Sequence, residues 1–504
     1  MAVYILAWQL QSQLVLNYDV SWLMHAARRL LAGGTYSQDF FETNPPLILY
    51  LYLPPVILSK VLAADPILIF HEYIFLLASL SLVLSSILLR KIFTQNSALL
   101  ANAFLLMLAL VYLVLPCYDF GQRDHLLVLL AMPYLFLVVC RLQGKTIRPF
   151  YAFSLGVLAG LGFAIKPHFL ITPVLVELYY IFYKRNNWAW LRPEIVTILA
   201  ILVIYALSIF IFQPDYLYIV VPYSLRLYYS AVSQPWSALL LNSVVLYCAV
   251  PLIFYFVQYK ENPYKNLSTV LALALLGFLL SYFAQRMIHF YHLIPALSLA
   301  LLLMLVLFSS FLAEVPKRGP EGSFAVFLGV LIFIFPVWLF SNLYWGSLEY
   351  KRETLSKLAA FMETQAKQES VYFFVTAGSY AFPTVDYTDS RIAPRFYFLW
   401  MAAGLANREL ELAGTREADL LEQQRKDKNF LVNMVADDLY KYKPRFIFVD
   451  QSEDKYRVKD RNFDYLTYFS TNQKFRQEWK NYRYFTSLEQ KGLYKLGIYK
   501  RTAS

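Results

Sequence analysis

Ionisable side chains gather where long apolar stretches of this chain end. Asp19 directly follows the first apolar run, and Asp119 and Asp124 lie in a short polar segment between two later runs. A charge at the edge of a bilayer is costly, so such clusters are candidate functional sites. An ionised carboxylate only accepts hydrogen bonds, and it can orient or deprotonate an incoming hydroxyl group. These three aspartates are therefore the candidate catalytic residues, and the sequence does not decide between Asp119 and Asp124.

A second group of polar residues could bind an anionic substrate. Lys166 ends a glycine-rich apolar stretch, and Arg286 and His289 lie together in a later polar segment. Cations at such places can neutralise the charge that develops on a departing phosphate, and lipid phosphates lie at this depth. The candidate substrate-binding residues are Glu42, Asn44, Arg123, Lys166, Arg286, His289 and His292.

Simpler interpretations of these residues are also open. Arg28 and Arg29 could extend towards water from an interfacial helix, and the lysine and arginine candidates of the later segments could be interface anchors. The second-loop aspartates could pair with the adjacent Arg123 or His125.

The composition indicates a membrane protein with a more polar C-terminal part. The 504 residues are 59% hydrophobic and 16% charged, and residues 351–504 hold 26 of the 45 Lys and Arg and 20 of the 34 Asp and Glu. Runs long enough to cross roughly 30 Å of hydrocarbon, or about 20 helical residues, recur up to residue 342, and we expect about 11 transmembrane helices. The first run, 1–16, is short for a membrane span, so the span either includes residues 20–23 or begins upstream of residue 1. The other expected spans are 68–89, 97–116, 125–140, 150–165, 168–183, 195–213, 236–257, 267–284, 292–313 and 324–342.

Basic residues in alternate loops predict the orientation. By the positive-inside rule these loops are cytoplasmic. The intervening loops, including 17–67 and 214–235, then face outward, as does the tail. We therefore expect a transmembrane domain at 1–342 and an extracytoplasmic α/β domain at 343–504. The basic residues are Arg90, Lys91, Arg141, Lys145, Arg148, Lys184, Arg185, Arg192, Lys260, Lys265, Lys317 and Arg318.

The tail has the pattern of a mixed α/β domain. Residues 371–376 and 446–450 are strand-like, and 482–486 with 493–500 could form a hairpin around Lys491-Gly492. Polar and apolar residues alternate at helical spacing over 398–442.

Several of these motifs together resemble the GT-C superfamily of membrane glycosyltransferases, with the greatest similarity to bacterial family 39 members, which are relatives of protein O-mannosyltransferases and of lipid A aminoarabinose transferase. The first-loop motifs are Asp19 after the first run, Gly33-Gly34 at a helix end, and Asn44-Pro45-Pro46-Leu47 before the next helix. The acidic second loop, the lysine after a glycine-rich helix, the 285–295 segment with its Tyr-His pair and the aromatic tail hairpin follow in the same order. The resemblance covers most of the chain, and it is the order and sidedness of these short motifs that are specific.

The resemblance implies a polytopic α-helical GT-C protein that transfers a sugar from a polyprenyl-phosphate-linked donor. The acceptor would be an envelope lipid, glycan or protein, reached by inverting displacement at the outer face of the bacterial cytoplasmic membrane. Asp19 would be the first-loop catalytic aspartate, and Lys166, Arg286 and His289 would contact the lipid-linked phosphate. Asn44 departs from the pattern, since relatives often have Lys or His before the Pro-Pro pair. No cofactor is expected, although two acidic loops leave room for a divalent metal ion.

Other classes of protein fit the sequence less well. A transporter or flippase is the main alternative, because intramembrane charges also mark substrate pathways. It should contain duplicated halves with broken helices, and we find no such duplication. A membrane-anchored binding protein would need only one helix. The net charge of +11 comes without a basic stripe or zinc spacing, so no nucleic acid partner is expected.

Overall fold

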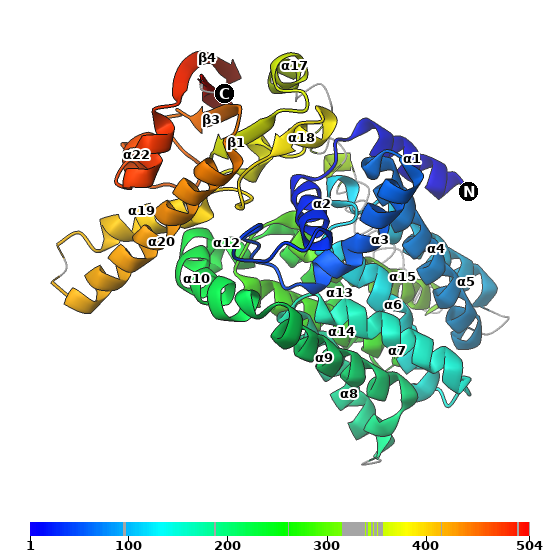
Figure 1. Ribbon diagram of the computed structural model, residues 1–504. Coiled ribbons are helices and arrows are strands. Elements are labelled where there is room, and N and C mark those ends of the chain that lie inside the picture. Colours follow the sequence, from blue (N-terminus) through cyan, green and yellow to red (C-terminus); the bar gives the residue numbers. More distant parts are fainter. Residues whose placement is uncertain are drawn as a thin grey trace. The chain divides into compact units, whose positions relative to one another are not determined.

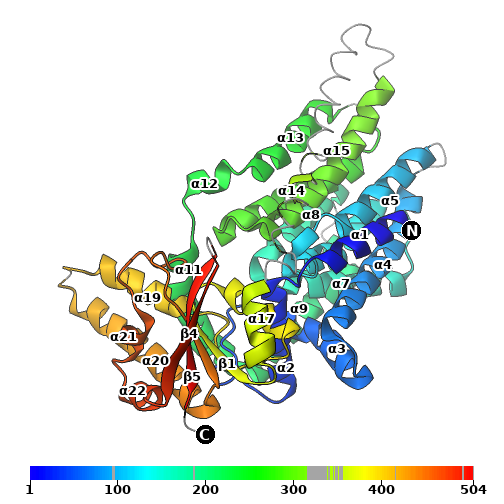
Figure 2. The same cartoon turned by 90° about the horizontal axis from the view of Figure 1, so that it is seen from above.

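The chain forms two compact units in the computed structural model (Figures 1 and 2). Unit 1 comprises Met1–Val15, Pro54–Ser208 and Gln234–Lys351, and unit 2 comprises Leu16–Leu53, Ile209–Ser233 and Arg352–Ser504. The expected span 324–342, except residues 338, 341 and 342, and the expected turn at 491–492 lie outside the described residues. The structure describes residues 1–93, 97–185, 188–260, 262–314, 338, 341–343, 346, 350, 356–414, 416–490 and 493–502.

Apolar helices dominate unit 1, which confirms the predicted polytopic α-helical membrane protein. Among the residues that the structure describes, five helical stretches are long and apolar enough to cross a membrane: Pro66–Ile92, Arg123–Leu142, Pro193–Phe212, Lys265–Gln285 and Phe290–Phe311. Shorter apolar helices cover Leu47–Leu62, Ala98–Leu113, Pro149–Ala164 and Ser243–Gln258. The main helices are α1 (Ala2–Gln13), α4 (Pro66–Ile92), α5 (Ala98–Leu113), α6 (Arg123–Leu142), α7 (Pro149–Ala164), α8 (Ile171–Lys184), α9 (Pro193–Phe212), α13 (Ser243–Gln258), α14 (Lys265–Gln285) and α15 (Ile294–Glu314).

Helix α6 lies at the centre of unit 1, between α4 and α7 (Figure 1). Within its apolar window, 94% of the residues are buried in the protein, against 28% in α4 and 22% in α9. A helix that is apolar all round must be buried or face lipid. We conclude that α6 packs against protein on all sides, whereas α4 and α9 present apolar surface to the bilayer.

The segment 17–67, which is predicted as a loop, contains two helices in the structure. They are α2 (Tyr18–Leu31) and α3 (Leu47–Leu62). Asn17 caps α2 by accepting hydrogen bonds from the backbone N–H groups of Asp19 and Val20. Helix α3 begins at Leu47, where the Asn44-Pro45-Pro46-Leu47 motif predicts the next helix, although no membrane span is predicted over it; it contains Pro54 and Pro55, which normally disfavour a helix interior.

The segment 214–235, which is predicted as a loop, is also largely helical. It contains α10 (Val221–Tyr223), flanked by two π-helical stretches, η5 (Tyr216–Val220) and η6 (Ser224–Tyr228).

The C-terminal part of unit 2 contains a five-stranded mixed sheet with the order β2-β1-β3-β5-β4. The strands predicted near 371 and 446 and the hairpin are confirmed, and the helical segment 398–442 forms α19 (Trp400–Glu411) and α20 (Ala418–Tyr442). Strand β3 pairs in parallel with β1 and antiparallel with β5. The strands are β1 (Ser370–Phe374), β2 (Arg391–Ile392), β3 (Phe446–Asp450), β4 (Tyr482–Gln490) and β5 (Tyr494–Arg501).

The two faces of this sheet are covered by different helices (Figure 2). Phe446 and Phe448 contact Phe361 of α17 (Ser356–Gln365) on one face. On the other face, Phe374 contacts Phe475 and Trp479 of α22 (Gln473–Trp479). Successive side chains of a strand point to opposite faces, so both sides of these apolar strands are buried.

Candidate functional site

A buried ion pair lies at the beginning of α6. The Asp124 carboxylate accepts a hydrogen bond from Lys166 Nζ at 2.8 Å, and the two side chains are 0% and 6% exposed. Asp124 is the second residue of α6, where the positive end of the helix dipole favours a carboxylate. The interpretation in which Asp124 pairs with an adjacent residue is therefore wrong, because its partner is 42 residues away in sequence.

Local sequence places Lys166 at this point. Helix α7 ends at Ala164, and Lys166 is extended (φ −142°, ψ 138°) because the residue before Pro167 avoids helical angles. Gly162 allows α7 to approach α6 closely, since a Cβ atom there would lie only 3.0 Å from the Cβ of Leu130. The lysine is thus carried to the beginning of α6 by close helix packing and a proline-induced helix end.

Two further side chains contact the Lys166 ammonium. Its ammonium donates to Gln285 Oε1 at 3.0 Å and lies 3.4 Å from His292 Nδ1. His292 Nδ1 is 3.5 Å from the Asp124 carboxylate. Three segments of unit 1 that are distant in sequence therefore meet in one polar cluster, which we call the Asp124 cluster: Asp124, Lys166, Gln285 and His292.

Arg123 and His289 lie beside the Asp124 cluster, through Tyr291. The Arg123 guanidinium lies 5.4 Å from the centre of the Tyr291 ring and donates to its hydroxyl at 3.3 Å. His289 is half-exposed and stacks nearly parallel to the same ring at 5.6 Å. The structure therefore brings four of the candidate substrate-binding residues into one neighbourhood: Arg123, Lys166, His289 and His292.

Arg286 makes its contacts elsewhere in unit 1. It ends α14 in a left-handed conformation with φ 53°. Its guanidinium donates to the carbonyl of Gln234 at 3.1 Å and lies 5.3 Å from the Trp236 ring. These contacts hold the guanidinium, whose Nε is buried, against the beginning of α12 (Trp236–Leu240).

Asp119 and His125 have different environments. Asp119 ends the short helix η2 (Cys117–Asp119) and is half-buried. The two ring nitrogens of His125 contact the Gly121 backbone N–H at 2.9 Å and the Tyr112 carbonyl at 2.8 Å. His125 thus serves to fix the turn before α6.

In unit 2, the candidates of the first loop surround the beginning of α2. Asp19 is half-buried in the first turn of that helix. One turn later, Trp22 Nε1 donates to Glu42 at 2.5 Å, and Glu42 also accepts from the backbone N–H of Asn44 at 2.6 Å. Glu42 is only 3% exposed. Its contacts hold the Asn44-Pro45 turn against α2.

The interpretation of Arg29 as an interfacial anchor that extends towards water is wrong. Its guanidinium donates to three backbone carbonyls, those of Asp39 at 2.6 Å, Pro394 at 2.8 Å and Ile392 at 2.5 Å. Arg28 is 3.6 Å from the carboxylate of Asp386. Both arginines therefore bind protein groups of unit 2.

Sequence reasoning missed three residues of these clusters. Gln285 and Tyr291 belong to the polar 285–295 segment, but neither carries a charge that would single it out. Trp22 lies within the apolar face of α2. Only the contacts described above distinguish these residues from ordinary helix-end or core residues.

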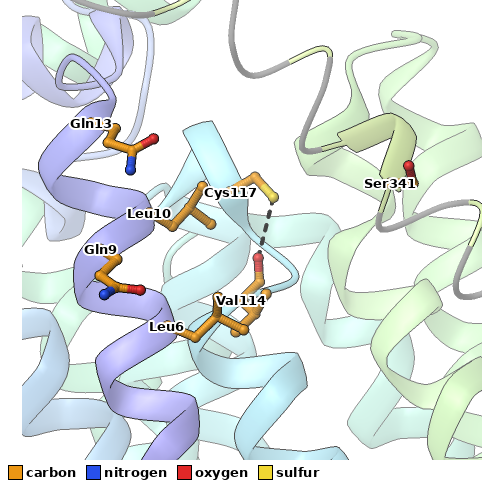
Figure 3. A pocket seen from close by; sticks show the side chains of 7 residues that line it. All are labelled: Leu6, Gln9, Leu10, Gln13, Val114, Cys117 and Ser341. Atoms are coloured by element: carbon orange, nitrogen blue, oxygen red, sulfur yellow. Dashed lines mark hydrogen bonds between the residues drawn. The ribbon is translucent and has the colours of Figure 1, made fainter.

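A separate pocket of about 370 Å³ lies in unit 1 beside α1 (Figure 3). Among the seven residues that line it there is no carboxylate or basic side chain, so it suits an apolar group better than a charged one. Cys117 donates its S–H to the carbonyl of Val114 at 3.3 Å. The lining residues are Leu6, Gln9, Leu10, Gln13, Val114, Cys117 and Ser341.

No group of three His, Cys, Asp or Glu side chains suited to a metal ion occurs among the residues that the structure describes.

Comparison with solved structures identifies the fold. No protein-family model and no curated protein matches this sequence. The structure of ArnT from Cupriavidus metallidurans bound to undecaprenyl phosphate matches with a TM-score of 0.56 at 13% identity, over 100% of this chain and 97% of that one. Apo ArnT from the same organism matches with a TM-score of 0.54 at 12% identity, over 89% and 92% of the two chains. At such identities the likeness concerns the fold alone: this polytopic membrane protein with a C-terminal α/β part has the fold of ArnT, as expected from its GT-C resemblance.

Proposed function

We propose that this protein is a membrane glycosyltransferase that transfers a sugar from a polyprenyl-phosphate-linked donor to a cell-envelope acceptor. One observation carries the proposal: the whole chain follows the fold of a protein whose crystal structure holds undecaprenyl phosphate. The first-loop motif around Asp19 points to the same class. The proposed location is the outer face of the bacterial cytoplasmic membrane, and the acceptor is a lipid, a glycan or a protein hydroxyl.

The proposed reaction is a single inverting displacement. The acceptor oxygen attacks the anomeric carbon while the bond to the polyprenyl phosphate breaks and the phosphate takes the bonding electrons. Asp19 accepts the proton if the acceptor is a hydroxyl, and only positions the acceptor if it is already an anionic phosphate. Arg286 and His289 are half-exposed, so they are better placed than a buried side chain to contact the departing phosphate.

Lys166 and Asp124 then have a supporting role. Their charges compensate each other at 2.8 Å in a site that is almost closed to solvent. We assign this pair to fixing the beginning of α6 and the 285–295 segment, and thereby the position of Arg123 and His289. Asp119 remains the other second-loop carboxylate that can act on substrate.

The experiment is turnover by purified protein in lipid nanodiscs with polyprenyl-phosphate-linked sugars and envelope lipid extracts. Release of polyprenyl phosphate and the mass of the product are measured. Asp19→Asn is expected to lower the rate by about 10²–10⁴-fold, as for loss of a general base. Asp454→Asn, at an aspartate that is 77% exposed on the tail, is the matched control.

Wild-type turnover by Asp19→Asn would sink the mechanism. Substrate flux across liposomes without release of polyprenyl phosphate would favour the transporter or flippase instead.

A further inference from the structure

One face of α2 is bound to a single carboxylate of the C-terminal part of unit 2. Ser21, His25 and Arg28 are spaced so that they share a helix face, and all three contact Asp386. His25 Nε2 is 2.8 Å from Asp386 Oδ1, and Arg28 is 3.6 Å from the same oxygen. The Ser21 hydroxyl donates to Asp386 Oδ2. The carboxylate therefore joins two turns of α2 to α18 (Thr384–Tyr387).

The next residue of α18 holds the segment that leads into α2. The Tyr387 hydroxyl accepts a hydrogen bond from the backbone N–H of Leu16 at 3.0 Å. Asp19 lies between Leu16 and Ser21 in sequence. Two consecutive residues, Asp386 and Tyr387, thus fix the backbone on both sides of the proposed catalytic aspartate.

The neighbouring face of α2 is fixed by backbone groups. Arg29 donates hydrogen bonds to the carbonyls of Ile392 and Pro394, which lie shortly after α18 in sequence. Because two faces of the helix are held by one part of the chain, rotation of α2 about its axis would break contacts on both. The Asp386 side chain is only 8% exposed, so its contacts are shielded from water.

We infer that Asp386 is a positioning residue that sets the orientation of α2 and hence of Asp19. The C-terminal part of unit 2 then contributes directly to the catalytic geometry. The expected effect on catalysis rests on the proposed glycosyltransferase function, whereas the effect on the orientation of α2 does not.

Two variants test the inference. Asp386→Asn removes the charge at nearly constant volume, and Tyr387→Phe removes only the hydroxyl group that holds Leu16. The control is Asp437→Asn, since that carboxylate is 53% exposed and pairs with Lys474. Amide hydrogen exchange is followed in peptides from α2, β1 and β3, and kcat and KM for the donor are measured in nanodiscs.

Both variants are expected to speed exchange in α2 while β1 and β3 exchange as in the wild type, and the control is expected to change none of them. Asp386→Asn is expected to lower kcat about 10- to 100-fold, with KM for the donor changed less than about twofold. Wild-type exchange in α2 of both variants, or equal acceleration in α2, β1 and β3, would overturn the inference. If the wild type has no turnover, the proposed function fails, and the exchange data still decide the mechanical role.

Discussion

At the scale of single residues, the pair formed by Asp124 and Lys166 predicts a measurable coupling. Removing one partner of a buried ion pair leaves an uncompensated charge and costs about 3–5 kcal/mol. We expect Lys166→Met to lower the free energy of unfolding in detergent by that amount. Asp124→Asn should lower it less, because the ammonium that it leaves is still bound by Gln285. The double variant should be more stable than Lys166→Met. The pairing would be contradicted if each single variant lowered the free energy of unfolding by less than about 1 kcal/mol and the two losses added up in the double variant.

Replacement of Arg286 tests whether its charge is needed for turnover without unfolding the protein. Its left-handed conformation costs about 1 kcal/mol for a residue with a Cβ atom, and glycine avoids this cost. Arg286→Gly therefore relieves backbone strain, which offsets the loss of the guanidinium's contacts with Gln234 and Trp236. We expect turnover to fall at least tenfold at near wild-type stability, because the charge on the departing phosphate is no longer neutralised.

The control for Arg286→Gly is Arg185→Gly. Arg185 ends α8 in the same conformation, with φ 51° and ψ 35°, in a loop predicted to be cytoplasmic. Its replacement should leave turnover unchanged. Equal losses in both variants would show that the arginine at the end of α14 has no special part in the reaction.

The types and places of these residues were predictable, but their partners were not. Lys166 stands out in the sequence because an ammonium at an apolar helix end is costly. Gln285 is neutral, and its contact with Lys166 depends on how α14 packs against the segment that follows α7, which no short motif encodes. The contacts of Glu42 likewise depend on Trp22, which is indistinguishable in sequence from a core residue.

At the scale of helices and strands, periodicity and length explain what could be predicted. Runs such as 267–284 and 446–450 have one dominant pattern, and the structure places a helix and a strand there. The beginning of helix α3 is predictable from the Asn44-Pro45-Pro46-Leu47 motif, but its continuation through Pro54 and Pro55 is not, because proline normally disfavours a helix interior. The π-helical stretches η5 and η6 depend on local packing, because nothing in their composition differs from an α-helix.

Helix α2 should lose stability on acidification. Burial lowers the pKa of His25, although Asp386 opposes this and Arg28 and Arg29 add to it. The unfolded chain, with a His pKa near 6.5, then holds more protons than the folded protein, so the free energy of unfolding falls as pH drops below about 7. One group contributes at most about 1.4 kcal/mol per pH unit.

The measurement is hydrogen exchange in α2 peptides, corrected for intrinsic rates, at pH values from 7.5 to 5. His25→Gln should flatten the dependence in this range. Asp386 acts in the same direction only at lower pH: burial raises its pKa, but His25 and Arg28 outweigh this and hold it below the usual value. A wild-type profile in the His25→Gln variant would exclude the histidine as the source.

At the scale of the whole molecule, the distribution of charge predicts which parts lie on each side of the membrane. Loops rich in Lys and Arg stay on the cytoplasmic side, which assigns 143–148 to the inside and the tail to the outside. The three native cysteines, Cys117, Cys140 and Cys248, are buried. Introduced cysteines can therefore report sidedness without removal of the native ones.

Thr146→Cys and Ser487→Cys place one exposed thiol in the 143–148 loop and one on β4, with no change of charge. We expect a membrane-impermeant maleimide to label Ser487→Cys in intact bacterial cells and Thr146→Cys only after the membrane is permeabilised. The wild type, treated in the same way, gives the background of the buried cysteines. Labelling of Thr146→Cys in intact cells, with Ser487→Cys protected, would place the tail in the cytoplasm. Because α2 is bound to the C-terminal part of unit 2, α2 and Asp19 would then lie on the cytoplasmic side as well. This result would contradict the proposed location of the reaction at the outer face.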